Sequence, residues 1–279
     1  MREHRRTAVY LAIAFAWTWT LWIGAFLSGR SSGAEVDTGG TLFDAFGRVG
    51  TPGFVPQLLF VLAVYGPLLG YLAARRYRPF WGRPTVSIVL LAVAVPTVSI
   101  LPAFALTLVS GVPASSMSAT TAAAAVSLYL VSNLLTSGTE EFGWRGYLYP
   151  ALRARERTFW GAAWKGGLIW AVWHYPLMVI LYWDLGLVVL VPTVAGFTAS
   201  IVAMNYITNF VYERSESIAL AMLLHALNNT AGFALVLLFP TTPFTIVTAL
   251  MAWAFVGFLE WRYRIDAKGV SDRPAAPAP

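Results

Sequence analysis

Two neighbouring carboxylic acids, Glu140 and Glu141, stand at the end of a long apolar run and are followed by Arg145. Acidic side chains close to hydrocarbon are costly and are rarely kept without a role. On a helix, Glu141 and Arg145 lie four residues apart on one face and can pair. Glu140 points about 100° away from them and stays free for chemistry. A solvated salt bridge at a cytoplasmic helix end is the alternative interpretation.

Two of the three histidines, His174 and His225, also lie inside apolar segments. His174 follows Lys165 by nine residues, which is about 13 Å of helix, and His225 lies at a similar depth in its own segment. Trp170 is one turn before His174 and can pack beside the imidazole, and Pro176 loosens the backbone bonds just beyond it. Each histidine alone could serve only as a hydrogen bonder between helices.

The third group of polar residues contains asparagines. His225 and Asn229 are four residues apart and share a helix face, and two fixed N–H donors on one face suit the stabilisation of an oxyanion. Asn228 points elsewhere and is interpreted as a residue that joins helices. Asn205 and Asn209 share a face of a further apolar segment and are interpreted as packing residues, with a role in lining the site as the alternative.

These groups allow two kinds of hydrolytic chemistry. A carboxylate and an imidazole can activate water, while a second imidazole and an amide hold the oxyanion. The same set of Glu140, His174 and His225 could instead bind zinc, and the sequence leaves both possibilities open. The chain has no cysteine, no His-Glu-x-x-His motif and no Gly-x-Ser-x-Gly turn, so a thiol nucleophile and those two catalytic motifs are excluded.

The composition indicates a membrane protein. The 279 residues are 58% hydrophobic and 11% charged, against about 25% charged in ordinary soluble domains. Apolar runs of about 20 residues recur, and none alternates with period two, so all are predicted as membrane-spanning helices. The eight predicted segments are 7–27, 54–74, 86–109, 119–139, 161–183, 186–210, 218–239 and 243–261. The predicted fold is an all-α, polytopic membrane bundle of about eight helices.

Charge sets the expected orientation. If the N-terminus is cytoplasmic, all but two of the 19 Lys and Arg residues, Arg30 and Arg48, fall in cytoplasmic pieces, so both termini are predicted inside. The net charge of +6 then fits loops that face anionic lipid, and nucleic acid is not an expected partner. Residues 1–270 are predicted as one membrane-embedded domain, and the Pro/Ala-rich tail 271–279 as disordered.

In this order on successive helices, the motifs Glu-Glu-x-x-x-Arg, aromatic-x-x-x-His and His-x-x-x-Asn resemble the CPBP family. This family contains the CAAX prenyl endopeptidases of the Ras-converting type and bacterial relatives that include bacteriocin self-immunity proteins. The resemblance covers roughly residues 119–239, which would be the catalytic core. Each short motif is weak alone, but the ordered set of three is specific. Trp170 stands where the family pattern often has Phe, which keeps an aromatic ring at this position.

The resemblance implies an intramembrane endopeptidase whose cavity opens to the cytosol and whose substrate is a peptide or membrane protein. Carried over by position, Glu140 would be the general base, with His174 helping to activate water. His225 and Asn229 would form the oxyanion site. Metal dependence is left open by the resemblance, so zinc remains an alternative to a glutamate mechanism.

Glu141 and Arg145 would order the first motif. A composition rich in Ala, Arg and Gly suggests a bacterial inner membrane as the location. One alternative function is a non-proteolytic scaffold or bacteriocin-immunity protein of the same fold. Another is a small ion-coupled transporter in which Glu140 and the histidines relay protons, although the chain shows no inverted repeat.

Overall fold

The computed structural model describes residues 2–74 and 81–263, and within these ranges the chain is helical without strands. An isolated bridge joins Trp81 to Ser217. The predicted all-α bundle is therefore confirmed. Three arginines of the predicted second cytoplasmic loop, the basic residues after 263 and the tail 271–279 lie outside the described residues.

Among the described residues, five helical runs are long and apolar enough to cross a membrane. They are α1 (Arg2–Ser32), α5 (Val86–Val109), α11 (Leu187–Ser215), α12 (Ile218–Leu238) and the run Ala119–Arg153, which joins α6 (Ala119–Leu135), η1 (Ser137–Thr139), α7 (Glu140–Gly143), η2 (Trp144–Leu148) and α8 (Tyr149–Arg153). The fourth predicted segment thus continues past its expected end at residue 139, so the two glutamates lie inside a helical run.

Two further spans are bent. The pair α3 (Phe54–Ala63) and α4 (Gly66–Ala74) turns by 48°, and the pair α9 (Phe159–Trp173) and α10 (Tyr175–Tyr182), with η3 (Trp183–Leu185), turns by 45°. Counting each pair as one span gives up to seven spans. The eighth predicted segment corresponds to α13 (Ile246–Tyr263), which is not among these seven. Eight spans and cytoplasmic termini therefore stay predictions.

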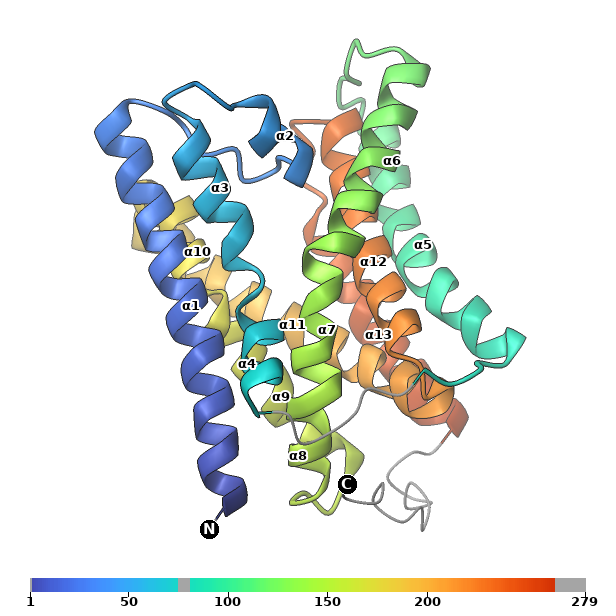
Figure 1. Ribbon diagram of the computed structural model, residues 1–279. Helices are drawn as coiled ribbons and strands as arrows, with labels where there is room; N and C mark the ends of the chain where they lie inside the picture. The colour runs from blue at the N-terminus through green and yellow to red at the C-terminus, as the bar shows by residue number, and fades with distance from the viewer. Residues whose placement is uncertain (1, 75–80, 264–279) are drawn as a thin grey trace.

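α1, α3 and α4 lie on one side of the bundle, and α5, α6 and α12 lie on the other (Figure 1). On one side α1 packs against α3 and α4, and on the other α12 packs against α5 and α6. Between them, α11 packs against α9 and α13. The start of α1 and the end of α8 lie at one end of the bundle, whereas α2 (Leu42–Gly47) and its flanking loops lie at the other (Figure 1).

Close packing fixes α7, the short helix that carries the two glutamates. A Cβ atom added at Gly143 would lie 2.5 Å from the carbonyl oxygen of Pro67 in α4. A larger side chain would therefore push the two helices apart. Immediately after Gly143, η2 is π-helical, and single π turns inside α-helices occur often at functional sites. The contact with α4 and the π turn set the direction in which Glu140 faces.

The bend between α9 and α10 positions His174. This residue ends α9 and begins α10, and Pro176 follows it in the first turn of α10. Proline has no N–H, and its ring clashes with the carbonyl four residues earlier, so a helix breaks or kinks here. The loosened backbone predicted around Pro176 is thus confirmed as a break in the span.

The connection between α1 and α3 lies at the α2 end of the bundle (Figure 1). The side-chain amide of Gln57 accepts a hydrogen bond from the Asp37 amide N–H and donates one to the Asp37 carbonyl, both at 2.9 Å. The Leu42 amide N–H donates to Ser132 Oγ of α6 at 2.8 Å. These bonds tie the connection to α3 and α6 and hold it in a defined position.

Candidate active site

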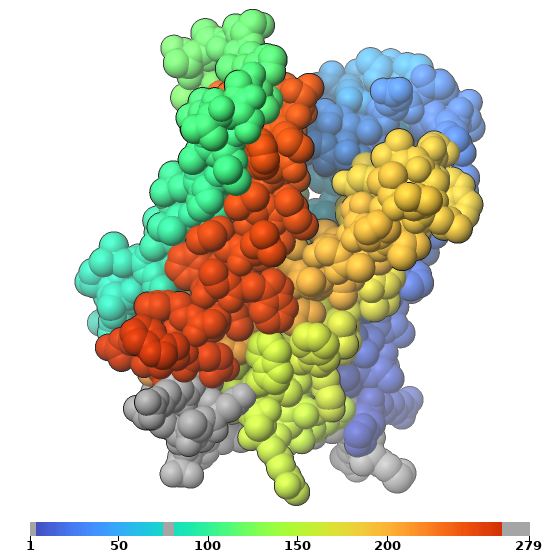
Figure 2. Space-filling model, turned by 180° about the vertical axis from the view of Figure 1, so that it is seen from behind, coloured from blue at the N-terminus to red at the C-terminus, as the bar shows by residue number. Residues whose placement is uncertain are grey.

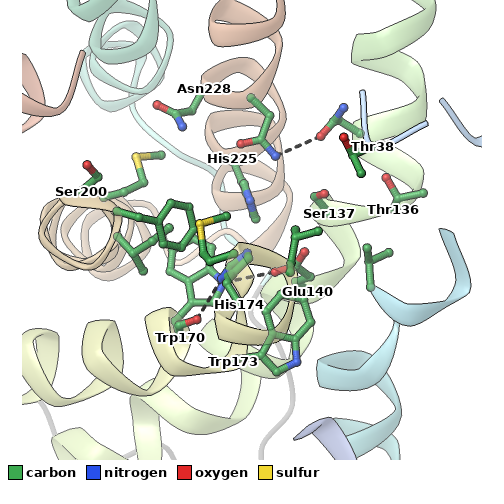
Figure 3. Close-up of a pocket in the computed structure, with 18 of the residues that line it drawn as sticks. Thr38, Thr136, Ser137, Glu140, Trp170, Trp173, His174, Ser200, His225 and Asn228 are labelled. Carbon is green, nitrogen blue, oxygen red and sulfur yellow. Dashed lines mark hydrogen bonds between the residues drawn. The ribbon is translucent and has the colours of Figure 1, made fainter. Parts of the chain in front are cut away.

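The four residues expected to perform chemistry meet in one place. Glu140, His174, His225 and Asn229 come from three separate spans and line a common cavity of about 380 Å³ (Figure 3). The expected convergence is therefore present in the structure. Glu141 and Arg145 do not line this cavity. We call the five buried residues Glu140, Glu141, Arg145, Trp170 and His225 the motif cluster.

Glu140 is held by two tryptophans. Its side chain is buried, and Oε2 accepts hydrogen bonds from the indole N–H groups of Trp144 at 3.0 Å and Trp170 at 3.2 Å. The sequence predicted a Glu140 carboxylate without partners, whereas in the structure two hydrogen bonds fix the direction of this carboxylate. Trp170 was expected only to pack beside His174. The donor role of Trp144 was missed, although its position four residues after Glu140 could have indicated it.

The expected pair of Glu141 and Arg145 forms, but it is not solvated. Arg145 Nη1 lies 2.9 Å from Glu141 Oε2 and 3.1 Å from Oε1, and the hydrogen-bond angle suits only Oε1. Both side chains are fully buried, which rules out the alternative of a salt bridge at a wet helix end. The guanidinium also lies 4.8 Å from the ring centre of Trp170.

Asn205 completes the surroundings of Arg145. Its Oδ1 accepts a hydrogen bond from Arg145 Nη2 at 3.0 Å, and its Nδ2 donates to the Ala163 carbonyl at 2.7 Å. Asn205 therefore links α9, η2 and α11 instead of acting as a simple packing residue, and it does not line the cavity. Asn209 is buried on the same helix, and neither polar atom of its side-chain amide has a hydrogen-bond partner in the described part of the chain.

His225 is linked to the same network. Its Nδ1 lies 2.8 Å from Glu141 Oε1. Because an ionised carboxylate only accepts hydrogen bonds, Nδ1 carries a proton, and Nε2 is the nitrogen left for a substrate. Nε2 can donate to an oxyanion only when the ring is doubly protonated. This link between the first and third motifs was not expected.

In His174, as in His225, Nε2 is the ring nitrogen that has no bond within the site, and here it is available for base chemistry. Its Nδ1 lies 2.9 Å from the Trp170 carbonyl oxygen. A carbonyl only accepts, so Nδ1 bears the proton, and in the neutral ring Nε2 has a free lone pair. Trp173 packs edge to face on the imidazole at 4.6 Å, and Phe197 does so at 5.1 Å. The packing restricts rotation of the ring, so Nε2 has a fixed direction.

The last expected site residue, Asn229, is held by a partner that sequence reasoning missed. Asn229 Nδ2 donates to Asn133 Oδ1 at 3.0 Å, and Asn133 Nδ2 donates to the Tyr129 carbonyl at 3.1 Å. Asn133 lies two turns before Glu140 and carries the single side-chain amide of segment 119–139, and this amide was the available signal. Asn228 was expected to join helices. Instead it lines the cavity, and its side chain has no hydrogen bond within the described ranges.

The cavity extends well beyond the motif cluster. Its lining includes Thr38, Gly40 and Leu42 of the connection at the α2 end of the bundle. Viewed from the other side, the surface is hollowed between α13 and the segment formed by α10 and the start of α11 (Figure 2), and cavity residues on α11 and α13 include Ser200 and Thr248. The charge bias predicts that the α2 end is the outer end, and this orientation stays a prediction. The side from which a substrate enters stays a prediction.

The zinc alternative depends on whether Glu140, His174 and His225 can share one ion. Within the described residues, no group of three or more His, Asp or Glu side chains is positioned to hold a metal ion. Of the expected ligands, Glu140 uses Oε2 for two indole donors, and His225 uses Nδ1 for Glu141. A histidine that bonds through Nδ1 can still ligate a metal through Nε2, so zinc stays a prediction, and no step below involves a metal.

Comparison with known proteins agrees with the motifs. Residues 121–231 match the family model described as Type II CAAX prenyl endopeptidase Rce1-like, and this range includes every motif residue from Glu140 to Asn229. A curated relative, CAAX prenyl protease 2 of Methanococcus maripaludis, is 40% identical over 47 residues. That alignment spans only 17% of this chain and 17% of the relative.

Residues 121–231 are thus similar to an Rce1-like domain, and the resemblance to the CPBP family is confirmed for this part of the chain. The protein is an all-helical, multi-pass membrane protein in its described residues. Because the aligned part of the relative is short, the activity and substrates belong to the proposal that follows.

Proposed function

We propose that the protein is an intramembrane endopeptidase that uses Glu140 to activate water. The observation that carries this proposal is the meeting of Glu140, His174, His225 and Asn229 at one cavity. Two of these groups can accept a proton from water, and two can donate to a developing oxyanion. A shared cavity is what hydrolysis requires and what isolated hydrogen bonds between helices would not need.

The proposed reaction begins with a water molecule between Glu140 and His174. Glu140 takes a proton as the water oxygen attacks the carbonyl carbon of the scissile peptide bond, while His174 Nε2 accepts a hydrogen bond from the same water. The new C–O bond gives a tetrahedral intermediate whose oxyanion receives hydrogen bonds from His225 and Asn229. The C–N bond then breaks, and Glu140 returns its proton to the leaving amine.

The fixed positions of these groups support the proposed roles. Two indole donors hold Oε2 of Glu140, and the Trp170 carbonyl holds the ring of His174. Groups that are already oriented lose little entropy when a substrate binds, which is a large part of the advantage of an enzymatic site. The substrate class is a peptide or a membrane-protein segment, because the site lies inside a bundle of membrane-spanning helices.

The test compares peptides from membranes that contain wild type or Glu140→Gln. We expect shortened products only with wild type, and loss of at least about 100-fold in cleavage of those substrates by the purified variant in liposomes. Glutamine retains a carbonyl oxygen for the two indoles, so the fold should be kept.

Glu156→Gln is the matched control, since Glu156 pairs with the exposed Lys165 outside the cavity. Normal turnover by Glu140→Gln would refute the proposed base. A cellular phenotype fully rescued by Glu140→Gln would favour a scaffold or immunity protein.

A further inference from the structure

A second cavity of about 300 Å³ adjoins the first and shares part of its wall. The two cavities have Ser99, Tyr129, Asn228, Asn229 and Thr248 in common. We call the second cavity the second lobe. Since Asn229 borders both cavities, a peptide bound at the motif cluster can extend one side chain past Asn229 into the second lobe.

Ser99, in the middle of α5, is the most unusual group of this wall. Its side chain is buried at 6% exposure, yet its hydroxyl has no hydrogen-bond partner among residues 2–74 and 81–263. Other hydroxyls in the same bundle donate to the carbonyl four residues earlier, including Thr97 at 2.8 Å and Thr107 at 2.7 Å on this same helix. Ser99 does not use this local acceptor, so its donor remains available on the cavity wall.

Asn228 offers a second set of polar atoms. It lines both cavities, and its side-chain amide makes no hydrogen bond within the described part of the chain. In Figure 3 it lies on the side of α12 away from the labelled Glu140. Its neighbour Asn229 is instead bonded to Asn133. Adjacent amides thus differ: Asn229 is part of a fixed pair, whereas Asn228 is unbonded.

The rest of the lining defines what fits. The described residues around the second lobe include apolar groups such as Pro96, Ile100 and Phe233, and none of them is charged. A buried polar group without a partner costs about 1–3 kcal/mol, so a ligand that supplies the missing hydrogen bonds gains affinity that an apolar ligand does not. A charged side chain would find no counter-ion in this lining.

From these observations we propose that the second lobe is a specificity subsite for one neutral, hydrogen-bonding side chain of the peptide substrate, such as glutamine, asparagine or serine. Ser99 and Asn228 are the residues that recognise it. This inference rests on the proposed peptidase function, because it assumes that the ligand of the main cavity is a polypeptide.

The test uses labelled apolar peptides that differ only in a single residue, glutamine, serine or leucine, moved along the sequence. Binding is measured to Glu140→Gln protein in liposomes, and cleavage is measured with the wild type. We expect one position at which glutamine or serine is preferred over leucine by about 10-fold or more in affinity and in kcat/KM, because a site built for hydrogen bonds rejects a ligand that lacks them.

Ser99→Ala and Asn228→Leu should each remove most of this preference, so that the glutamine, serine and leucine peptides are bound and cleaved about equally well. Thr97→Val is the matched control, because Thr97 is exposed on the same helix and bonds only to its own backbone. Ser99→Val also adds bulk to the cavity wall. It should therefore weaken the binding of the glutamine peptides, whose side chain is larger than that of serine.

The outcomes separate the two proposals. A preference in binding that Ser99→Ala abolishes supports the subsite even if no peptide is cleaved, in which case only the peptidase function fails. Identical profiles for wild type, Ser99→Ala and Asn228→Leu would overturn the subsite even if cleavage is normal. Binding of peptides with no positional preference would also overturn it.

Discussion

The motif cluster and the second lobe are both polar and adjacent, but they differ in how their polar atoms are used. Every side chain of the motif cluster has at least one hydrogen-bond partner within the protein. In the second lobe, Ser99 and Asn228 have none among the described residues. Groups that already bond to each other are fixed before a substrate arrives, whereas unbonded groups are available to recognise one. We therefore expect the motif cluster to hold its groups in place for the reaction and the second lobe to select the substrate.

The strongest test of this difference is Glu141→Gln, which removes the charge between Arg145 and His225. Leaving a buried charge without its partner costs about 3–5 kcal/mol, so the variant should unfold at clearly lower denaturant or temperature in micelles. The double variant Glu141→Gln with Arg145→Met should recover part of the loss. By contrast, Ser99→Ala should leave stability almost unchanged. Equal stability of Glu141→Gln and wild type would mean that the pair does not organise the cluster.

A second prediction concerns His174, which contributes to chemistry more than to the fold. His174→Phe keeps a ring among Trp173 and Phe197 but removes the Nε2 lone pair, so the rate of cleavage should fall by about 100-fold. The unfolding midpoint should change little. His4→Ala is the control, since His4 is exposed near the start of α1. A variant that is slow only because it is misfolded would show a shifted midpoint.

A third prediction has a moderate effect. Asn205→Leu leaves Arg145 Nη2 without its acceptor and the Ala163 carbonyl without its donor. Hydrogen bonds between membrane helices contribute about 0.6 kcal/mol on average and at most about 1.7, so a loss of about 1 kcal/mol is expected. Because Asn205 acts through Arg145 and Glu141, kcat should fall while KM stays constant. A change in KM alone would place Asn205 at the substrate instead.

The smallest effect is expected for Trp170→Phe. This change removes one of the two N–H donors to Glu140 but keeps an aromatic ring under the Arg145 guanidinium. The donor from Trp144 remains. We therefore expect a decrease of only a few-fold in kcat, whereas the double variant Trp144→Phe with Trp170→Phe should lose more than the sum of the two single effects. Additive losses would show that the two indoles act independently.

Sequence alone located the polar residues that line the cavity better than the residues that hold them in place. Glu140, His174, His225 and Asn229 were found because ionisable or amide groups stand out in apolar helices and their order matches a known family. The contacts of Asn133 and Asn205 depend on how helices cross, which spacing along the chain does not give. The contact of Trp144 with Glu140 follows from a spacing of four residues and was missed. The unusual state of Ser99 was not predictable either, because serine is common in membrane helices and only the structure shows that its hydroxyl avoids its own backbone.

Helix boundaries show the same limit. The apolar pattern located every span, but it placed the end of the fourth at residue 139 because Glu140 and Glu141 resemble a polar terminus. The helical run continues to Arg153, because neighbouring helices supply partners that replace water. Hydropathy measures the cost of exposing a residue to lipid and takes no account of partners inside the bundle.

The π turn η2 has a consequence for how this span tolerates length changes. Before the turn, α6 packs against α12, and after it, α8 packs against α9. A π turn holds an additional residue relative to regular α-helix. It therefore changes which face of the helical run α8 turns toward α9, without changing the face that α6 turns toward α12. Deleting a single residue between Trp144 and Leu148 would rotate the distal part by about 100°. Such a shortened protein could still insert into a bilayer while its two halves could no longer both dock.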